Sequence, residues 1–325
     1  MKKYTVCSVD DGIPCSHAAS VLELKNGNIF CVWYGGDNEG DDNSVDYYST
    51  FNSGQWSKPE VMWDYPGMGA GNPRVAYDGK RTLWAFIPAN RGGRKAWCMG
   101  GTLFYYAFST NDGKSFTSPV HIPELDNLLG KNKPLLLKNG NLLIPTTHEV
   151  EKSSVFIEFD TSSAQCVNRS KSLFLPNKGF CIQPTIEYLE DGRIIALLRT
   201  KNGKIWKSYS SDEGRTFSEP EETEIPHNHS GIDIARLSNG KFMLAYNNCG
   251  NDKRTPLNLA LMDEDLKIEK EAVIEEGKGE FSYPAVIQAS DRKVHLVYTY
   301  ITTERDFWGA SGTHIKHVVT DEELN

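Results

Sequence analysis

Two β-rich runs flank a tight turn in the segment His17-Ala-Ala-Ser-Val-Leu-Glu-Leu-Lys-Asn26-Gly27-Asn-Ile-Phe-Cys-Val-Trp33. An Asn-Gly pair between two such runs is a strong local signal for a β-hairpin, because both residues tolerate the positive φ that the turn requires. The same unit recurs along the chain, with later turns at Asp78-Gly79, Asn139-Gly140, Asp191-Gly192, Asn239-Gly240 and, without the glycine, Asp291-Arg292. The segment is therefore one copy of a repeat.

Six copies of this hairpin predict six blades. The residues that begin the first run of each copy are 49 to 61 residues apart, and they are His17, Asn72, Lys133, Gln183, Ile232 and Tyr283. A repeat of this length accommodates four antiparallel strands, and small sheets repeated around an axis form a propeller. We therefore expect an all-β, six-bladed β-propeller that occupies residues 1–325 as a single domain.

A second motif lies between the hairpins. Ser210-Ser-Asp212-Glu-Gly214-Arg-Thr-Phe217 has the form S-x-D-x-G-x-x-[WF]; Ser109–Phe116 matches it with Asn in the third position, and Ser49–Trp56 is a weaker copy. The Ser and Asp side chains in such a turn bond to nearby backbone N–H groups, while the glycine takes the left-handed conformation. We expect a structural role for it, with the aromatic residue packed between blades.

Composition limits the partners. The net charge of −8 argues against nucleic acid or an anionic membrane surface as a partner, because both favour basic proteins. No apolar stretch is long enough to span a membrane, and no signal-peptide core follows Met1, so we expect a cytoplasmic protein. The seven cysteines show no metal-ligand spacing, so we expect neither a metal nor a cofactor.

Polar side chains are predicted to gather at one mouth of the channel. The start of each innermost strand and the end of the second strand lie at the same mouth, because the two strands are antiparallel. These positions hold His17, Asn72, Lys133, Gln183 and Tyr283 at strand starts, and Tyr34, Asn90, His148, Arg199, Asn247 and Tyr300 at strand ends. We interpret this ring as a ligand site.

Structural roles are the alternative for some of the ring. A structural role is as well supported as a ligand role for three of them. Their side chains would then bond to backbone groups where strands end; these residues are Asn90, Asn247 and Gln183. A single histidine is more often a satisfied core residue than a catalytic one, but His17 and His148 in one ring favour proton transfer near neutral pH. Arg199 ends an apolar strand, where it needs a carboxylate, a phosphate or several carbonyl groups as partners.

At this point the sequence resembles the sialidase superfamily, in its branch of BNR-repeat propellers. The likeness covers nearly the whole chain and rests on an ordered set of motifs: Ser210–Phe217, Ser16-His-Ala-Ala-Ser with Trp33-Tyr-Gly-Gly, Ile182-Gln-Pro-Thr, Asn228-His-Ser-Gly-Ile-Asp233 and Glu280-Phe-Ser-Tyr-Pro. The turn motif alone is weak, since unrelated proteins carry it, whereas the ordered set is much more specific.

The resemblance implies roles for individual residues. Sialidases hold the sugar carboxylate with three arginines and attack with a tyrosine that a glutamate supports, while an aspartate is the acid/base. By this resemblance Tyr283 is the tyrosine, and Arg199 and Arg254 are the second and third arginines. His17 replaces the first arginine and Gln183 replaces the glutamate. For the aspartate there are only loose candidates, Asp41 and Asp42.

These departures favour changed chemistry at an acidic sugar. Losing the glutamate removes the group that makes tyrosine nucleophilic, so we predict β-elimination, as in the propeller lyases of this branch that split rhamnose from glucuronate. One of His17 and His148 would then take the proton beside the carboxylate, and Tyr283 or the other histidine would protonate the leaving oxygen. The predicted substrate-binding residues are Arg199, Arg254, Asn72, Lys133, Gln183, Asn247 and Tyr300.

Two other functions stay open at this stage. One is an exo-sialidase that tolerates His17 and Gln183, and the other is a non-catalytic propeller that binds glycans or proteins, because the fold alone specifies no function. For both enzymatic hypotheses, the lyase and the exo-sialidase, the predicted partner is an acidic oligosaccharide. The sequence does not predict the oligomeric state.

Overall fold

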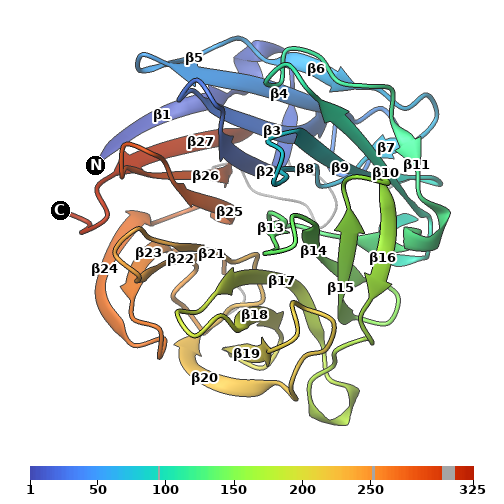
Figure 1. Cartoon of the computed structure of the whole chain (residues 1–325). Helices are drawn as coiled ribbons and strands as arrows, with labels where there is room; N and C mark the ends of the chain where they lie inside the picture. Colours follow the sequence, from blue (N-terminus) through green and yellow to red (C-terminus); the bar gives the residue numbers. More distant parts are fainter. Residues whose placement is uncertain (94–95, 251–252, 302–311) are drawn as a thin grey trace.

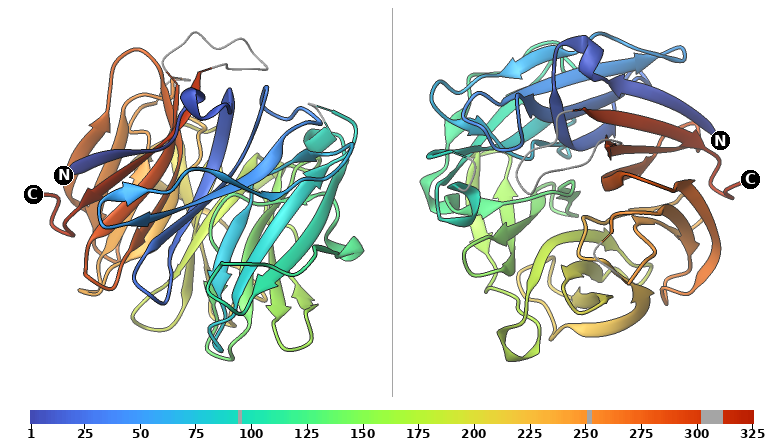
Figure 2. Two further views of the ribbon diagram at one scale, coloured as in Figure 1. Left: turned by 90° about the horizontal axis from the view of Figure 1, so that it is seen from above. Right: turned by 180° about the vertical axis from the view of Figure 1, so that it is seen from behind.

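A computed structural model describes residues 1–93, 96–250, 253–301 and 312–325. Within these residues the strands form six antiparallel sheets, which Figure 1 shows arranged around a common centre. The side view in Figure 2 shows the sheets standing next to one another as blades. The prediction of an all-β, six-bladed propeller is therefore confirmed.

The first three blades each contain an additional short strand. Blade 1 is β2 (Cys15–Glu23), β3 (Ile29–Gly36), β4 (Val45–Asn52), β5 (Gln55–Trp56) and β6 (Glu60–Trp63). Blade 2 is β7 (Gly69–Ala70), β8 (Arg74–Tyr77), β9 (Leu83–Asn90), β10 (Thr102–Ser109) and β11 (Val120–His121). Blade 3 is β12 (Leu128–Leu129), β13 (Leu135–Leu136), β14 (Leu142–His148), β15 (Ser153–Asp160) and β16 (Gln165–Arg169).

The last three blades have the predicted four strands. Blade 4 is β17 (Cys181–Tyr188), β18 (Ile194–Thr200), β19 (Lys204–Ser210) and β20 (Glu221–Pro226). Blade 5 is β21 (Asp233–Arg236), β22 (Phe242–Tyr246), β23 (Leu257–Met262) and β24 (Ile268–Glu275). Blade 6 is β25 (Glu280–Gln288), β26 (Val294–Ile301), β27 (Thr313–Thr320) and β1 (Lys2–Cys7).

Proline divides the innermost strand in blades 2 and 3. Pro73 lies between β7 and β8, and Pro134 lies between β12 and β13. Proline has no N–H to contribute to a strand ladder, so the pairing with the second strand stops there. Asn72 and Lys133, which were predicted at strand starts, therefore lie in the breaks, immediately before a proline.

The ring closes between the two ends of the chain. The N-terminal strand β1 pairs with β27 antiparallel, with Lys2 opposite Val319 and Lys3 opposite Val318. Both termini therefore lie at the rim of the same blade (Figures 1 and 2). This pairing supplies the outermost strand of blade 6 from the opposite end of the sequence and covers an edge that would otherwise be open.

The turn motif has the structural role that was expected. Ser210 Oγ accepts a hydrogen bond from Gly214 N over 2.9 Å, and Asp212 Oδ1 accepts one from Thr216 N over 2.9 Å. The Phe217 ring stacks on Phe156 of blade 3, with the centroids 3.8 Å apart. The motif thus closes its own turn and fastens one blade to the next.

Short 3₁₀ helices occur outside the blades: η1 (Val9–Asp11), η2 (Ala96–Cys98), η3 (Pro123–Leu125) and η4 (Pro176–Lys178). Among the residues described, no helix has the length and hydrophobicity needed to cross a membrane. The acidic stretch 263–276 forms a loop and strand β24 (Ile268–Glu275), the outermost strand of blade 5.

Candidate functional site

Backbone bulges on the inner strands turn two predicted site residues into the channel. The pairing of β17 with β18 skips Gln183, and the pairing of β25 with β26 skips Tyr283, so each lies in a bulge with positive φ (46° and 52°). Non-glycine residues in this conformation are strained and gather at functional sites. In β2 the corresponding bulged residue is Ala18, φ 54°. His17 therefore lies one position earlier in its strand than Gln183 and Tyr283, which corrects the alignment made from the turns.

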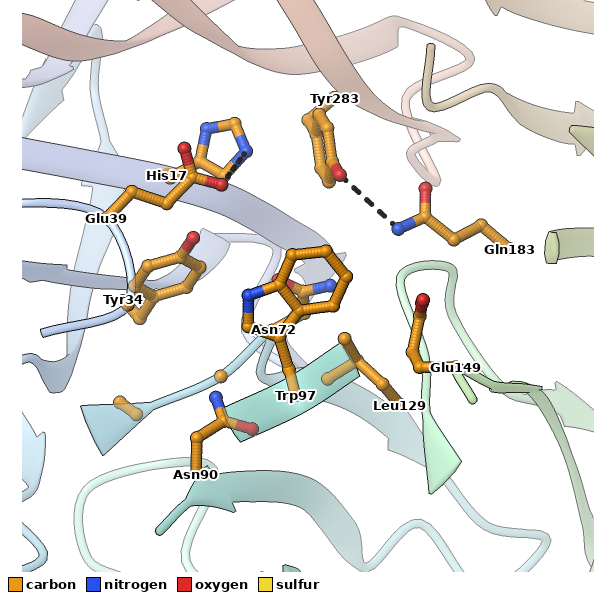
Figure 3. A pocket seen from close by; sticks show the side chains of 13 residues that line it. His17, Tyr34, Glu39, Asn72, Asn90, Trp97, Leu129, Glu149, Gln183 and Tyr283 are labelled. Atoms are coloured by element: carbon orange, nitrogen blue, oxygen red, sulfur yellow. Dashed lines mark hydrogen bonds and ion pairs between the residues drawn. The ribbon is translucent and has the colours of Figure 1, made fainter. Parts of the chain in front are cut away.

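A cavity of about 460 Å³ opens beside these bulges. Its lining comes from blades 1, 2, 3, 4 and 6 and consists of His17, Tyr34, Glu39, Gly40, Ala70, Gly71, Asn72, Asn90, Trp97, Leu129, Glu149, Gln183 and Tyr283. Figure 3 shows the labelled side chains directed toward a common space. The structure thus brings together six residues of the predicted ring, namely His17, Tyr34, Asn72, Asn90, Gln183 and Tyr283.

The hydroxyl of Tyr283 is surrounded by hydrogen-bond donors. Arg199 Nη1 donates to it over 3.2 Å and Gln183 Nε2 over 3.4 Å. The guanidinium carbons of Arg199 and Arg254 lie 5.7 and 5.5 Å from the centre of its ring. Burial acts to raise the pKa of Tyr283, but the charges of Arg199 and Arg254 and the two hydrogen bonds outweigh it, and the pKa is lowered from its ordinary value.

Partners fix the orientation of the groups around Tyr283. Arg199 Nη1 also donates to Gln183 Oε1 over 2.6 Å, and Arg199 Nη2 donates to the His229 carbonyl over 2.8 Å. Because arginine has no acceptor, the amide oxygen of Gln183 must face Arg199 and its nitrogen must face Tyr283. Arg254 donates to Glu280 Oε1 over 2.6 Å. The guanidinium groups of Arg199 and Arg254 do not line the cavity. Their positive charge acts on Tyr283 and Gln183, which do line it.

His17 contacts both Tyr283 and an acidic residue. Its ring centroid lies 4.2 Å from that of Tyr283. Nδ1 of His17 is 3.0 Å from Thr299 Oγ1, and Nε2 is 3.9 Å from Glu39 Oε1 (Figure 3). Both ring nitrogens of His17 thus have a polar group nearby. His17 and Glu39 therefore form one unit at the cavity wall.

A second carboxyl group faces the cavity from blade 3. Glu149 is 2% exposed, and its Oε2 lies 3.1 Å from Lys152 Nζ. Burial raises the pKa of Glu149 even though Lys152 acts to lower it. Figure 3 shows Glu149 at the cavity edge near Gln183 and Leu129. One acid with a raised pKa and one phenol with a lowered pKa thus line the same space.

A family model agrees with this architecture. The model of the BNR repeat-like domain matches residues 27–296. The chain belongs to the BNR repeat-like domain family. No curated protein matches the sequence of this BNR repeat-like chain at a significant level.

Solved structures with the same fold include sialidases. A protein of unknown function from Dyadobacter fermentans has a TM-score of 0.79 and 16% identity, covering 98% of each chain. The leech intramolecular trans-sialidase complexed with 2,7-anhydro-Neu5Ac has a TM-score of 0.81 and 12% identity, over 100% of this chain and 71% of that one. The intramolecular trans-sialidase from Ruminococcus gnavus has a TM-score of 0.77 and 12% identity, over 98% and 97%. At these identities the likeness shows that the BNR repeat-like chain has a sialidase-like propeller fold.

Several predicted residues of the BNR repeat-like chain lie away from the cavity. Lys133 Nζ bonds to Asp233, 3.1 Å from each carboxylate oxygen, and to the Ile234 carbonyl. Asn247 Nδ2 bonds to the carbonyls of Pro256 and Phe281. Tyr300 packs on Phe281 at 5.1 Å and His314 at 6.1 Å. Lys133 and Asn247 therefore join neighbouring parts of different blades and Tyr300 packs within blade 6, and none of the three lines the cavity.

His148 is also outside the lining, and its neighbour Glu149 is inside it. The His148 Nδ1 accepts a hydrogen bond from Glu151 N over 3.3 Å, within the turn that follows β14. Successive side chains of an extended chain point to opposite sides. An alignment of the repeats that is wrong by one position therefore selects a structural residue in place of one that lines the cavity. Glu149, Glu39 and Trp97 were not predicted as site residues.

The structure also places Asp41 and Asp42, the loose candidates for the acid/base aspartate. Asp41 accepts a hydrogen bond from Asn38 Nδ2, and Asp42 accepts one from Gly93 N. Glu39, from the same loop, is the carboxylate that lines the cavity. In the parts of the chain that the structure describes, no three His, Cys, Asp or Glu side chains are grouped so as to hold a metal ion.

Proposed function

We propose that this protein is a glycan-cleaving enzyme that acts at a carboxylated sugar, with β-elimination from a uronate as its reaction. The observation that carries the proposal is the Tyr283 hydroxyl, which accepts hydrogen bonds from Arg199 and Gln183 and has a lowered pKa. The side chain that faces this hydroxyl is an amide, so Tyr283 has no carboxylate there to accept its proton. A phenol with a lowered pKa can ionise, and its phenolate oxygen can then act as the base that takes a proton from the substrate.

The proposed step uses two groups with opposite pKa shifts. The Tyr283 phenolate takes the proton on the carbon next to the uronate carboxylate. The electrons of that C–H bond form the C4–C5 double bond, and the C4–O bond breaks. The leaving oxygen takes a proton from Glu149, which burial keeps protonated to higher pH than an ordinary glutamate. Pairs of titratable groups shifted in opposite directions are typical of acid/base pairs.

The cations beside Tyr283 and the other lining residues suit substrate binding. Arg199 and Arg254 supply positive charge beside Tyr283, which favours an anionic sugar and an ionised transition state. The Trp97 ring and Leu129 offer apolar surface at the cavity to the C–H face of a sugar ring. Asn72 lines the same cavity with an amide oxygen for sugar hydroxyls, since its Nδ2 bonds to the Gly130 carbonyl.

The first experiment is incubation with a rhamnosyl-glucuronate disaccharide while the ultraviolet absorbance of an unsaturated uronate is followed. We expect absorbance to rise with the wild-type protein, and Tyr283→Phe to abolish the rise with little change in ligand affinity. Free sialic acid released from a sialoside, with no unsaturated product, would contradict elimination and favour hydrolysis.

The second candidate is a sialidase-type hydrolase with Tyr283 as the nucleophile. The sialidases among the similar structures favour it, and a lowered pKa makes Tyr283 a better nucleophile as well as a better base. A non-catalytic glycan-binding propeller is distinguished by mutation, because Tyr283→Phe and Glu149→Gln would then change affinity alone.

A further inference from the structure

The break in the inner strand of blade 3 places two polar side chains inside the channel. Lys131 and Asn132 lie between β12 and β13 and are 2% and 1% exposed. Neither was predicted as a site residue, and neither lines the cavity. Both side chains contact residues of other blades, and these contacts indicate their role.

Lys131 and Asn132 bond to the bulges that carry the site residues. Lys131 Nζ donates to the Pro284 carbonyl, directly after Tyr283, and to the Ile232 carbonyl over 3.1 Å. Asn132 Nδ2 donates to the Gln183 carbonyl over 3.2 Å and to the Pro184 carbonyl over 3.0 Å.

The two side chains also bond to each other, with Lys131 Nζ 2.9 Å from Asn132 Oδ1. One continuous chain of hydrogen bonds therefore joins the bulge of blade 4 to the bulge of blade 6.

Bulges need such partners because they interrupt the strand ladder. Where two residues oppose one, a carbonyl group loses its partner on the neighbouring strand, and a buried carbonyl without a partner is costly. Gly231, beside Lys131, also leaves no spare room: a Cβ there would lie 3.1 Å from Lys131 Cε and 3.3 Å from Tyr283 Cα. The packing between Lys131 and the Tyr283 bulge is therefore tight.

We propose that Lys131 and Asn132 are positioning residues that hold Tyr283 and Gln183 in their strained backbone conformations, with the Tyr283 hydroxyl against Arg199. The inference rests on the proposed function for its catalytic consequence. Its structural content, the position and ionisation of Tyr283, does not depend on any substrate.

The chemistry of Lys131 supports a dedicated role. Its ammonium has three donors and meets three oxygen acceptors, two of them backbone carbonyls. Burial lowers its pKa to about 7, although Asp233 acts against this, and the charges of Lys133 and Arg199 lower it further. A buried cation held chiefly by carbonyls costs stability, so its presence favours a functional purpose over a purely structural one.

The experiment compares Asn132→Leu and Lys131→Met with the wild-type protein. Asn132→Leu removes the bonds to the blade 4 bulge without a change in charge, and Lys131→Met removes the bond to the blade 6 bulge. Arg74→Met is the matched control, because Arg74 is a buried cation that bonds to Pro145 instead of a bulge. Melting temperatures identify any variant that fails to fold.

The deciding readouts need no substrate. In ultraviolet difference titration against Tyr283→Phe, we expect both variants to raise the pKa of Tyr283 toward the ordinary tyrosine range, and Arg74→Met to leave it unchanged. If Asn132→Leu leaves the titration of Tyr283 unchanged, the proposal is overturned, because Lys131 would then act through its charge alone. Crystals of Asn132→Leu that retain positive φ at Gln183 and Tyr283, with Tyr283 still bonded to Arg199, would overturn it as well.

With a cleaved substrate the same variants give a kinetic readout. We expect kcat to fall about a hundredfold with KM little changed, since misplacement of a catalytic group by about 1 Å has an effect of this size. A rise in KM alone would contradict positioning. Failure to find any cleaved sugar would defeat the proposed function, while the titration and the crystal structure would still decide the roles of Lys131 and Asn132.

Discussion

Replacing Gln183 by glutamate tests which ionisation state of Tyr283 the protein uses. In the wild-type protein the amide oxygen of Gln183 is held by Arg199 at 2.6 Å, and the amide nitrogen donates to the Tyr283 hydroxyl over 3.4 Å. The introduced carboxylate has no proton to donate. Tyr283 would therefore have to donate to it and keep its own proton, so the hydrogen bond would reverse its direction.

The distance sets the size of the effect. Two like charges 3.4 Å apart repel by about 5 kcal/mol at an effective dielectric constant of about 20. Arg199 contacts both groups and offsets part of this repulsion. A net effect in the usual range for neighbouring charges, about 1.4 to 4 kcal/mol, would lower the population of the Tyr283 phenolate about tenfold to a thousandfold.

The assay is kcat/KM for elimination as a function of pH, for the wild-type protein, Gln183→Glu and Gln183→Met. We expect Gln183→Glu to lower kcat/KM at neutral pH by the factor above, and to move the rise of activity to higher pH. Gln183→Met removes the donor without adding charge, so its effect should be smaller. Increased activity of Gln183→Glu, above all on a sialoside, would refute the reasoning, because Tyr283 would then be a nucleophile that needs a carboxylate base.

Three further predictions follow from buried groups. Glu149→Gln should lower kcat about a hundredfold or more with the fold intact; kinetics that stay within about tenfold of wild type would exclude Glu149 as the acid. Asp46 is fully buried, neither carboxylate oxygen has a hydrogen-bond partner among the described residues, and burial raises its pKa well above the usual value. Ionised Asp46 therefore costs native stability as pH rises, so Asp46→Asn should melt higher than wild type at about pH 8 and lose this advantage toward about pH 4; an equal difference at both values would contradict the assignment. A Cβ on Gly130 would collide with the Arg74 guanidinium and lie 2.9 Å from the Pro145 carbonyl, so Gly130→Ala should destabilise the protein by about 1 to 3 kcal/mol, and denaturant unfolding should show a smaller cost in an Arg74→Ala background.

The fold follows from the sequence because its signals are local. Each hairpin carries its own turn, as at Asn26-Gly27, where Gly27 takes φ 81°. Even the last turn, which lacks glycine, keeps this geometry: Arg292 adopts φ 66°, and Asp291 Oδ1 accepts a hydrogen bond from Lys293 N. Repetition of a local signal fixes the blade count without knowledge of any long-range contact.

Part of the site follows directly from the repeat. Tyr283, Gln183 and Arg199 were expected together and are hydrogen bonded. His148 was expected at the cavity, where Glu149 lies instead, because the extended chain alternates sides and no pattern in the sequence marks where the strand leaves the ladder.

The strand break before Pro134 also changes which residue of blade 3 lies near the site. It turns Lys131 to the bulges, while Lys133, the residue that the repeat alignment selected, pairs with Asp233. Loop residues such as Glu39 and Trp97 carry no periodic signal, so only tertiary structure brings them to the cavity.

The two departures from the sialidase pattern both contact Tyr283. A glutamate at position 183 would pair with Arg199 and neutralise the charge of its guanidinium. The Gln183 amide is neutral, so that positive charge is retained. Glu149 acts on Arg199 as well, but its raised pKa limits how much negative charge it contributes. Histidine in place of the first arginine removes a permanent cation and puts an imidazole ring 4.2 Å from the tyrosine ring. Glutamine in place of the glutamate is thus the departure that lets Arg199 lower the pKa of Tyr283, which is the property that the proposed elimination requires.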